Sequence, residues 1–172
     1  VLLLAPFPTI LFIMWNRNLL LKRNLREAME INLALSQKGL AAPTAGKSSM
    51  DTEENELLLT FRGGTKEVLE INASDFLYVE AEGNYIKLNY RTGSGSVERK
   101  TMRATMKQAE EAIADIPSIV RCHRAFLVNI GRITKVDGNS QGYRLQLKGC
   151  NDEVPVSRAY AKSVKEQLES IG

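Results

Sequence analysis

The periodicity of the apolar residues changes near Glu56, and this change divides the 172-residue chain into two parts. Before it, apolar residues recur every three or four positions, as on one face of a helix. After it, short segments alternate apolar and polar residues, as in "YIKLNY" at 85–90, and Gly-containing turns separate them. Alternation with a period of two is typical of strands that are buried on one face. The sequence therefore predicts a helical N-terminal part followed by a β-rich domain over 56–172.

The β-rich part is predicted to be mostly antiparallel sheet with two helices, a β-rich α+β fold. One helix is expected at 102–116, with Met102, Met106, Ala109 and Ile113 on one face and Pro117 at its end. Ser157 suits the N-cap of the last helix. The inward stripe of that helix is Ala161, Val164, Leu168 and Ile171. Strands are expected at 56–61, 66–71, 76–82, 85–90, 96–101, 119–122, 133–137, 143–149 and 153–157.

The first 15 residues, "VLLLAPFPTILFIMW", contain one polar residue, Thr9. As a helix they reach about 22 Å, against about 30 Å for the hydrocarbon core of a bilayer. We expect 1–16 to be the end of a transmembrane helix that begins upstream in a longer protein. The cations that follow place the C-terminal part in the cytoplasm under the positive-inside rule; they are Arg17, Lys22, Arg23 and Arg26. A signal-peptide core and a buried helix of a soluble domain are the alternatives.

Residues 17–38 form a predicted helix with a heptad seam. The seam residues are spaced 4, 3, 4 and 3 positions apart, and they are Leu21, Leu25, Ala28, Asn32 and Leu35. A buried Asn at the position of Asn32 can set the register of a parallel two-stranded coiled coil. This pattern predicts a homodimer; the alternative is an amphipathic helix that lies on the membrane or on the domain. Residues 39–55 are rich in Gly, Ala, Ser, Pro and Thr, which is typical of a flexible linker.

Charge and cysteine content restrict the function. The net charge is +3, and residues 121–172 hold nine Lys or Arg against five Asp or Glu. A mildly basic chain permits nucleic acid as a partner without requiring it. The two cysteines, Cys122 and Cys150, and the one histidine, His123, do not have the spacing of a zinc site or of a disulfide framework. We therefore expect no metal and no cofactor.

The stretch "VRCHRAFLVN" at 120–129 contains the histidine beside a cysteine. In an extended segment Cys122 and His123 point to opposite faces, so they cannot act together as nucleophile and base. We therefore expect that the protein is not an enzyme. His123 is interpreted as a hydrogen-bonded structural residue, with a phosphate or base contact as the alternative. Arg121 and Arg124 stand where loops leave the sheet. Arginine is well shaped to read guanine edges or hold phosphates, although a solvated charge is the alternative for each.

Four segments in order carry a family resemblance: "DFLYVEAEGNYIKL", "RATMKQAEEAI", "IVRCHRAFLVNIGRITKV" and "VPVSRAYAKSVKEQL". Together they resemble the LytTR-type DNA-binding domain of the LytR/AlgR/AgrA family of bacterial transcriptional regulators, over 56–172. The resemblance implies an elongated fold of short antiparallel strands. It also implies that loops, rather than a recognition helix, bind double-stranded DNA in two successive major grooves and in the minor groove between them.

Carried over to this chain, the resemblance places the loop at 82–85 in one groove, with Asn84 and Tyr85 as contacts. Arg124, after His123, is expected to project toward the DNA from the central loop. Arg158 is expected in another groove, and its place at a helix N-terminus also offers free N–H groups to a phosphate. Weaker contacts with the DNA backbone are expected from Lys87, Arg121, Asn139, Lys148 and Lys162.

Most familiar members of this family follow a phosphoacceptor receiver domain, whereas here an apolar stretch, a helix and a linker precede the domain. That order resembles the membrane-anchored LytTR proteins of bacteria. We therefore expect a transcriptional regulator that is the cytoplasmic output of a sensor at the bacterial inner membrane. Its expected partners are a second copy, repeated DNA half-sites, an upstream sensor domain and RNA polymerase. The alternative is a β-rich protein-interaction module without DNA binding, in which Asn84, Arg121, Arg124 and Arg158 would not converge.

Overall fold

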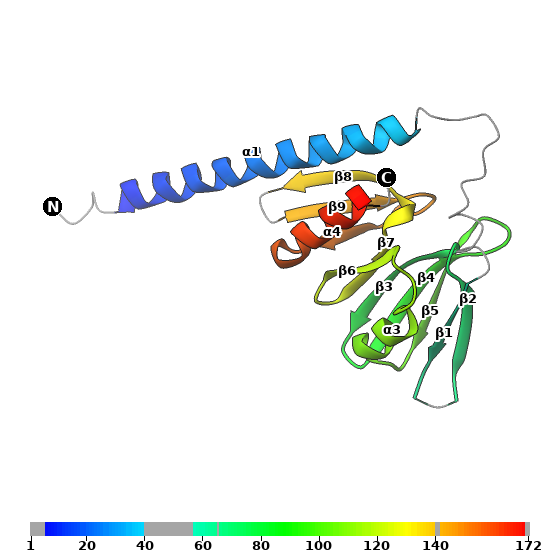
Figure 1. The fold of residues 1–172 in the computed structure, drawn as a ribbon. Coiled ribbons are helices and arrows are strands. Elements are labelled where there is room, and N and C mark those ends of the chain that lie inside the picture. The colour runs from blue at the N-terminus through cyan, green and yellow to red at the C-terminus, as the bar shows by residue number, and fades with distance from the viewer. Residues whose placement is uncertain (1–5, 40–56, 65, 140–141, 171–172) are drawn as a thin grey trace.

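The computed structural model describes residues 6–39, 57–64, 66–139 and 142–170, which form one long helix and a β-rich domain (Figure 1). The long helix is α1 (Pro6–Gly39). The domain follows as β1 (Leu58–Arg62), β2 (Val68–Asn72), β3 (Phe76–Glu82), β4 (Tyr85–Arg91), β5 (Val97–Met102), α3 (Met106–Ala112), β6 (Ile119–His123), β7 (Phe126–Asn129), the 3-10 helix η1 (Ile130–Arg132), β8 (Ile133–Asn139), β9 (Gly142–Leu147), β10 (Glu153–Val156) and α4 (Arg158–Ser170). The β-rich fold class predicted from the sequence is confirmed.

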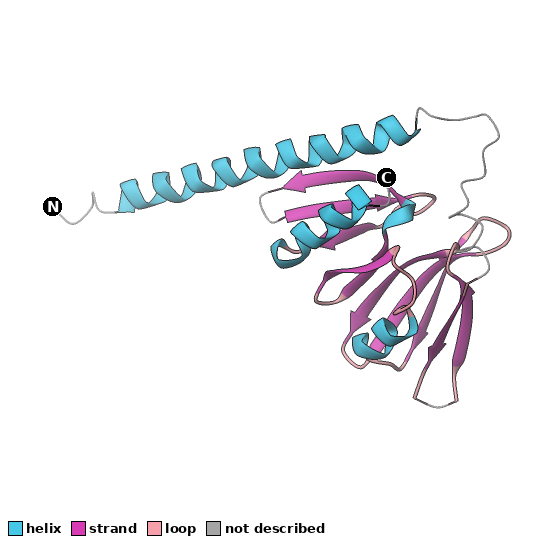
Figure 2. Ribbon diagram, viewed as in Figure 1, coloured by secondary structure: helices cyan, strands magenta, loops and turns pink. Residues whose placement is uncertain are grey.

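The strands form three antiparallel sheets (Figure 2). The central sheet has five strands in the order β5-β4-β3-β7-β6, and a second sheet has the order β10-β9-β8. The hairpin β1–β2 is a separate pair. Most paired strands are consecutive in the sequence and are joined by short turns, as antiparallel strands can be. Each strand therefore appears in the sequence as one alternating segment between two turn segments.

The central strand β3 is buried on both faces. Phe76 and Val79 belong to a first core, and Leu77 and Tyr78 to a second core on the opposite side. Each of these four side chains is at most 3% exposed. A strand that is covered on both faces has a continuous run of apolar residues rather than alternating apolar and polar residues. The sequence "FLYV" at the start of β3 is such a run.

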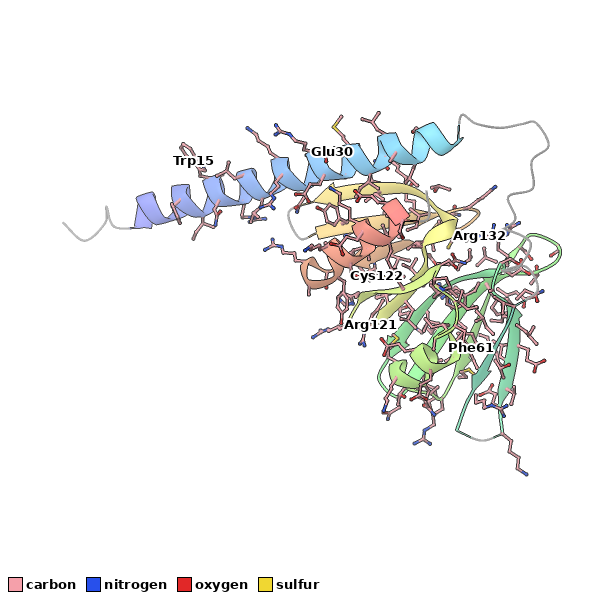
Figure 3. The ribbon with its side chains drawn as sticks, in the orientation of Figure 1. Trp15, Glu30, Phe61, Arg121, Cys122 and Arg132 are labelled. Atoms are coloured by element: carbon pink, nitrogen blue, oxygen red, sulfur yellow. The ribbon has the colours of Figure 1, made fainter. Side chains whose placement is uncertain are left out.

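The two cores are closed by different elements. The hairpin β1–β2 and α3 cover the first core, where the ring of Phe61 stacks on Phe76 with centroids 5.9 Å apart. The sheet β8–β10 and α4 cover the second core, which includes Cys122 and Val164. Figure 3 shows Phe61 and Cys122 in these two separate interiors. Val164 confirms the predicted inward stripe of the last helix, whereas Ile171 lies outside the described residues.

The first domain helix is shorter than the predicted 102–116. Thr105 begins it, because the Thr105 side chain accepts from the Gln108 backbone N–H and the Gln108 side chain accepts from the Thr105 N–H. This capping box ends the extended chain just before Met106. Met102 was therefore assigned to the wrong element: it is the last residue of β5 and is 1% exposed in the first core.

Helix α1 is continuous across the predicted boundary between 1–16 and 17–38. Its N-terminal half projects past the β8–β10 sheet, and Trp15 stands on this projecting half (Figures 1 and 3). In the part of the chain that the structure describes, no helix is both long and apolar enough to cross a membrane. Residues 1–5 and 40–56, which include almost all of the predicted linker, lie outside the described residues.

The C-terminal half of α1 covers the free edge of β8. The Asn32 side chain donates to the carbonyl oxygen of Val136 at 2.7 Å and accepts from the Val136 N–H at 2.8 Å. The carboxamide therefore replaces a neighbouring strand at an edge that would otherwise expose unpaired backbone groups. Gly138 permits this approach, because a methyl group there would overlap the carbonyl oxygen of Asn24.

The heptad seam thus contacts the chain's own domain, which is one of the alternatives that the sequence left open. Ala28 is buried in the second core and Leu35 packs against it, while Leu25 is 44% exposed. In this arrangement Ala28, Asn32 and Leu35 are not available to a second helix. The dimer remains a prediction that requires α1 to change its contacts.

Replacing Asn32 with Ala tests the edge contact. The substitution leaves the Val136 N–H and C=O facing the helix without their partner, which is expected to cost about 1–3 kcal/mol in the free energy of unfolding. Chemical denaturation and hydrogen exchange at the Val136 amide measure the effect. Met29→Ala, on the exposed side of α1, is the matched control. Unchanged protection of Val136 in the Asn32 variant would contradict the contact.

Candidate nucleic-acid interface

The segment "VRCHRAFLVN" forms a tight hairpin. β6 and β7 pair with His123 opposite Phe126, and Arg124 and Ala125 make the turn. The Ala125 N–H donates to Nδ1 of His123 at 3.2 Å, and the His123 ring lies against Phe126 with centroids 5.7 Å apart. Arg124 is exposed at the tip. The imidazole therefore shapes a turn that presents an arginine to solvent.

Burial lowers the pKa of His123 below 6.5, and the neighbouring Arg124 and Arg121 cations lower it further. The neutral ring is also the form that accepts from the Ala125 N–H at Nδ1. Cys122 is fully buried, and burial raises the pKa of its thiol to about 12. Its Sγ donates to the carbonyl oxygen of Phe126 at 3.6 Å. A protonated buried thiol beside a histidine that bonds to the turn backbone has the properties of a structural pair.

Arg121 stabilises the backbone of the β6–β7 turn. Its guanidinium donates to the carbonyl oxygen of Arg124 at 2.8 Å and to the Glu110 carboxylate of α3 at 2.8 Å. It also lies 5.8 Å from the centroid of the Tyr160 ring in α4. Charge-assisted bonds to a carbonyl and a carboxylate hold such a side chain in one position. The sequence predicts Arg121 as a DNA contact, whereas the structure uses its guanidinium within the domain.

The β3–β4 turn lies beside the β6–β7 turn. β3 pairs with β7, and beyond that pairing the Ala81 N–H donates to the carbonyl oxygen of Ala125 at 2.8 Å. Gly83 and Asn84 connect β3 to β4, and Gly83 has a φ of 61°, which favours glycine. Asn84 is exposed and Tyr85 is 50% exposed. Lys87 forms an ion pair with Glu82 at 2.5 Å across the same turn.

The start of α4 lies on the other side of the β6–β7 hairpin. The Ser157 N–H donates to the carbonyl oxygen of Cys122 at 3.0 Å, so β10 passes into α4 beside the end of β6. The helix begins at Arg158, directly after the predicted N-cap Ser157. Arg158 is exposed, as is Lys162 one turn later, which is 3.7 Å from Glu166.

We call the surface formed by residues 82–85, 123–126 and 157–162 the turn edge. These three segments follow one another along one side of the domain (Figure 1), and Arg121 lies on that side in Figure 3. Exposed side chains on this surface come from three separate parts of the sequence; they are Glu82, Asn84, Tyr85, Arg124, Arg158, Ala159 and Lys162. The convergence that the sequence analysis used as its discriminator is therefore present for Asn84, Arg124 and Arg158.

Two further predicted contacts are placed differently. β9 begins at Gly142, which lies beside the carbonyl oxygen of Val156, the residue before the turn-edge segment 157–162. Asn139 is the last residue of β8, and its side chain lies outside the described residues. Lys148 follows the opposite end of β9. Because a strand of this length spans about 20 Å, Lys148 is far from Gly142 and from the turn edge, and its contact with the DNA backbone stays a prediction.

Sequence reasoning missed two residues that support this site. Asn129 is 3% exposed, and its side chain donates to the carbonyl oxygens of Ala73 and Phe76 and accepts from the Gly131 N–H. It ties the end of β7 to the beginning of β3. Tyr160 places an aromatic ring against Arg121. An asparagine at the end of an apolar strand was a signal for the first, but the contact of Tyr160 depends on how α4 packs.

The exposed polar side chains of the turn edge stand on two short turns and on the first turns of α4. The described residues contain no group of three or more His, Cys, Asp or Glu that could hold a metal. The fold is that of a small β-rich domain with polar turns gathered along one edge. The sequence pattern of the LytTr DNA-binding domain matches residues 66–169. The chain belongs to the LytTr DNA-binding domain family.

Individual proteins are also similar to this chain. The chain is similar to an uncharacterized response regulatory protein of Vibrio cholerae, with 34% identity over 101 residues, covering 59% of this chain and 38% of the relative. It is also similar to one of Vibrio vulnificus, with 29% identity over 59% of this chain and 37% of the relative. The match thus spans less than two fifths of these relatives. A solved LytTr DNA-binding domain from Bacillus cereus shares the fold, with a TM-score of 0.50, 24% identity, and coverage of 64% of this chain and 95% of that one.

Titration of the single histidine tests the geometry of the β6–β7 turn. We expect NMR to give His123 a pKa below 6.5, and Arg124→Ala to raise that pKa because one neighbouring cation is removed. The folded state takes up a proton less readily than the unfolded state. The free energy of unfolding should therefore decrease as the pH falls from about 7.5 to about 5.5, and this decrease should be smaller in His123→Gln. A pKa at or above 6.5 would contradict the predicted neutral acceptor.

Proposed function

We propose that this chain is a transcriptional regulator that binds double-stranded DNA in a sequence-specific manner through the turn edge. The observation that carries the proposal is the convergence of Asn84, Arg124 and Arg158 from three segments. Two backbone hydrogen bonds join these segments, from Ala81 to Ala125 and from Ser157 to Cys122. Membership of the LytTr DNA-binding domain family supports the choice of DNA over a protein partner.

Arg124 and Asn84 are the proposed base-reading residues. Each stands on a two-residue turn between paired strands, so its backbone is held by the sheet. A guanidinium can donate two hydrogen bonds to guanine, and a carboxamide can pair with adenine. Arg121 is proposed to act by holding the carbonyl group of Arg124 in place rather than by touching DNA. His123 acts in the same way through the Ala125 N–H.

Arg158 and Lys162 are proposed to contact phosphates. Both are exposed on the first turns of α4, where the positive end of the helix dipole favours an anion. Their contribution should depend on salt rather than on sequence, because it arises from the release of counterions. Tyr85, Lys87 and Asn139 are proposed as further contacts with the DNA backbone next to the same turns.

The proposal is tested by selecting DNA from a random-sequence pool with the full chain. The enriched sequence is then titrated with the wild type and with variants. Arg124→Ala should lose about 1–3 kcal/mol on that sequence and discriminate less between bases at one position. Arg158→Ala should weaken binding to all sequences and reduce the slope of log K against log salt by about 1. Arg62→Ala, exposed on the hairpin β1–β2 and outside the turn edge, is the control.

If no sequence is enriched and binding stays weak at every salt concentration, DNA binding is rejected. The alternative, a β-rich module that docks a protein, then takes its place. If Arg124→Ala binds the selected sequence as the wild type does, the turn edge is not the reading surface even though DNA is the partner.

The finer arrangement is also part of the proposal: residues 1–16 end a membrane anchor, 17–38 form the connecting helix, 39–55 are a linker, and 56–172 are the DNA-binding domain on the cytoplasmic side. Apolar side chains on the projecting half of α1 support an anchor there; they are Ile10, Phe12, Ile13, Met14 and Trp15, each more than 50% exposed. The cations that follow, such as Arg17 and Lys22, suit a membrane surface. An upstream sensor would then act on the domain through α1.

A homodimer on repeated half-sites is proposed for the state in which α1 leaves β8. Only then are Ala28, Asn32 and Leu35 free to pair with a second copy of the helix. Linking two domains in this way raises the effective concentration of the second domain at its half-site.

Partition into phospholipid vesicles tests the anchor. The double variant Phe12→Asp, Trp15→Asp should bind vesicles much more weakly than the wild type, because two exposed apolar side chains become charged. Leu58→Asp, which changes a 54%-exposed side chain of β1, is the control and should partition as the wild type does. Equal partition of the double variant and the wild type would reject membrane attachment through this half of α1.

A further inference from the structure

A cavity of about 420 Å³ lies between α1, α4 and the β8–β10 sheet. Its volume is within the range of about 300–1,000 Å³ that is typical of small-molecule sites. The lining is largely aliphatic, with Leu20 and Ile31 from α1, Leu145 from β9, and Val164 and Leu168 from α4. Both helices and the sheet are therefore needed to form it.

The polar residues of this cavity carry mainly positive charge. Four of them are cations: Arg23 from α1, and Arg158, Lys162 and Lys165 from α4. Among the described lining residues, Glu27 alone carries a carboxylate. Hydrogen bonds from Tyr143 of β9 and from Arg23 of α1 lower the pKa of Glu27, so its carboxylate already has partners within the lining.

The lysines at the rim have weak partners. Lys165 is 3.9 Å from Glu30, and Lys162 is 3.7 Å from Glu166. The side chains of Glu30 and Glu166 are 61% and 62% exposed. Ion pairs this long and exposed contribute little, so an incoming anion can replace them.

We infer that this cavity binds a small anionic amphiphile, a molecule with an aliphatic chain and one carboxylate. The chain would lie on the aliphatic lining, where removal of apolar surface from water favours binding. The carboxylate would lie at the cationic rim beside Lys162 and Lys165, whose present ion pairs are long and exposed. An inorganic phosphate would leave the aliphatic lining uncovered, and a neutral hydrocarbon would form no ion pair with Lys162 or Lys165.

If the proposed function holds, occupancy of this cavity also has a consequence for DNA binding. Lys162 belongs both to the cavity lining and to the turn edge, so a carboxylate at Lys162 competes with a phosphate there. The ligand also bridges α1 and α4, and it therefore favours the state in which α1 remains on β8. The predicted effect of the amphiphile is weaker DNA binding.

Isothermal titration of the full chain with decanoate, without DNA and below the micelle-forming concentration, tests the site. We expect saturable binding of one decanoate per chain. Decanol, which lacks the charge, and butyrate, which lacks the long chain, should each bind at least about tenfold more weakly. Decyltrimethylammonium, which has the opposite charge, should not bind. No saturable binding of decanoate, or equal binding of decanol, would overturn the inference.

Two variants locate the ligand. Lys165→Glu should weaken decanoate binding about tenfold, and Leu20→Asp, which places a charge on the aliphatic lining, should abolish it. Lys107→Glu, an equal charge change on α3, should leave it unchanged. Leu20 is only half-buried and lies on α1, so circular dichroism should show an intact domain. Decanoate binding by Leu20→Asp and Lys165→Glu at the wild-type level would overturn the assignment, whereas the DNA selection tests the turn edge separately.

Discussion

The burial of β3 on both faces is the constraint on which the rest of this structure depends. Phe76 and Val79 hold one core and Leu77 and Tyr78 the other, so the hairpin β1–β2 and the sheet β8–β10 are packed on opposite sides of one strand. β3 also pairs with β4 on one side and with β7 on the other. The turns that follow β3 and precede β7 are consequently neighbours. Loss of this strand would remove both cores and the turn edge together.

The turn edge shows how a small sheet can hold loops in a fixed position. Arg121 and His123 bond to the backbone of the turn that carries Arg124, and Asn129 ties the far end of β7 to β3. Such supports reduce the number of conformations of an exposed arginine, which lowers the entropy lost on binding. The supporting residues do not need to touch the partner. This arrangement explains why a segment that contains Cys, His and Arg serves as a scaffold for one exposed side chain.

Helix α1 packs on the domain through hydrogen bonds as well as apolar contacts. Asn32 binds the edge of β8, Tyr143 donates to Glu27, and the aliphatic contacts leave a cavity between α1 and α4. An edge covered by a side-chain amide can be uncovered at lower cost than a packed core, since water can satisfy the same backbone groups. The helix is therefore suited to changing its contacts while the domain stays folded.

The sequence by itself determined the β-rich class, the positions of most strands and the last helix, because these depend on local alternation and on turn residues. It also indicated Asn84, Arg124 and Arg158, because their family pattern is local. Only the tertiary structure decided that Arg121 turns inward to Glu110, that Met102 ends a strand, and that Asn32 binds β8 rather than a second helix. Each of these outcomes depends on a contact between residues that are distant in sequence or on a competing cap. A heptad seam indicates only that one face of a helix is buried. Which surface buries that face depends on the fold.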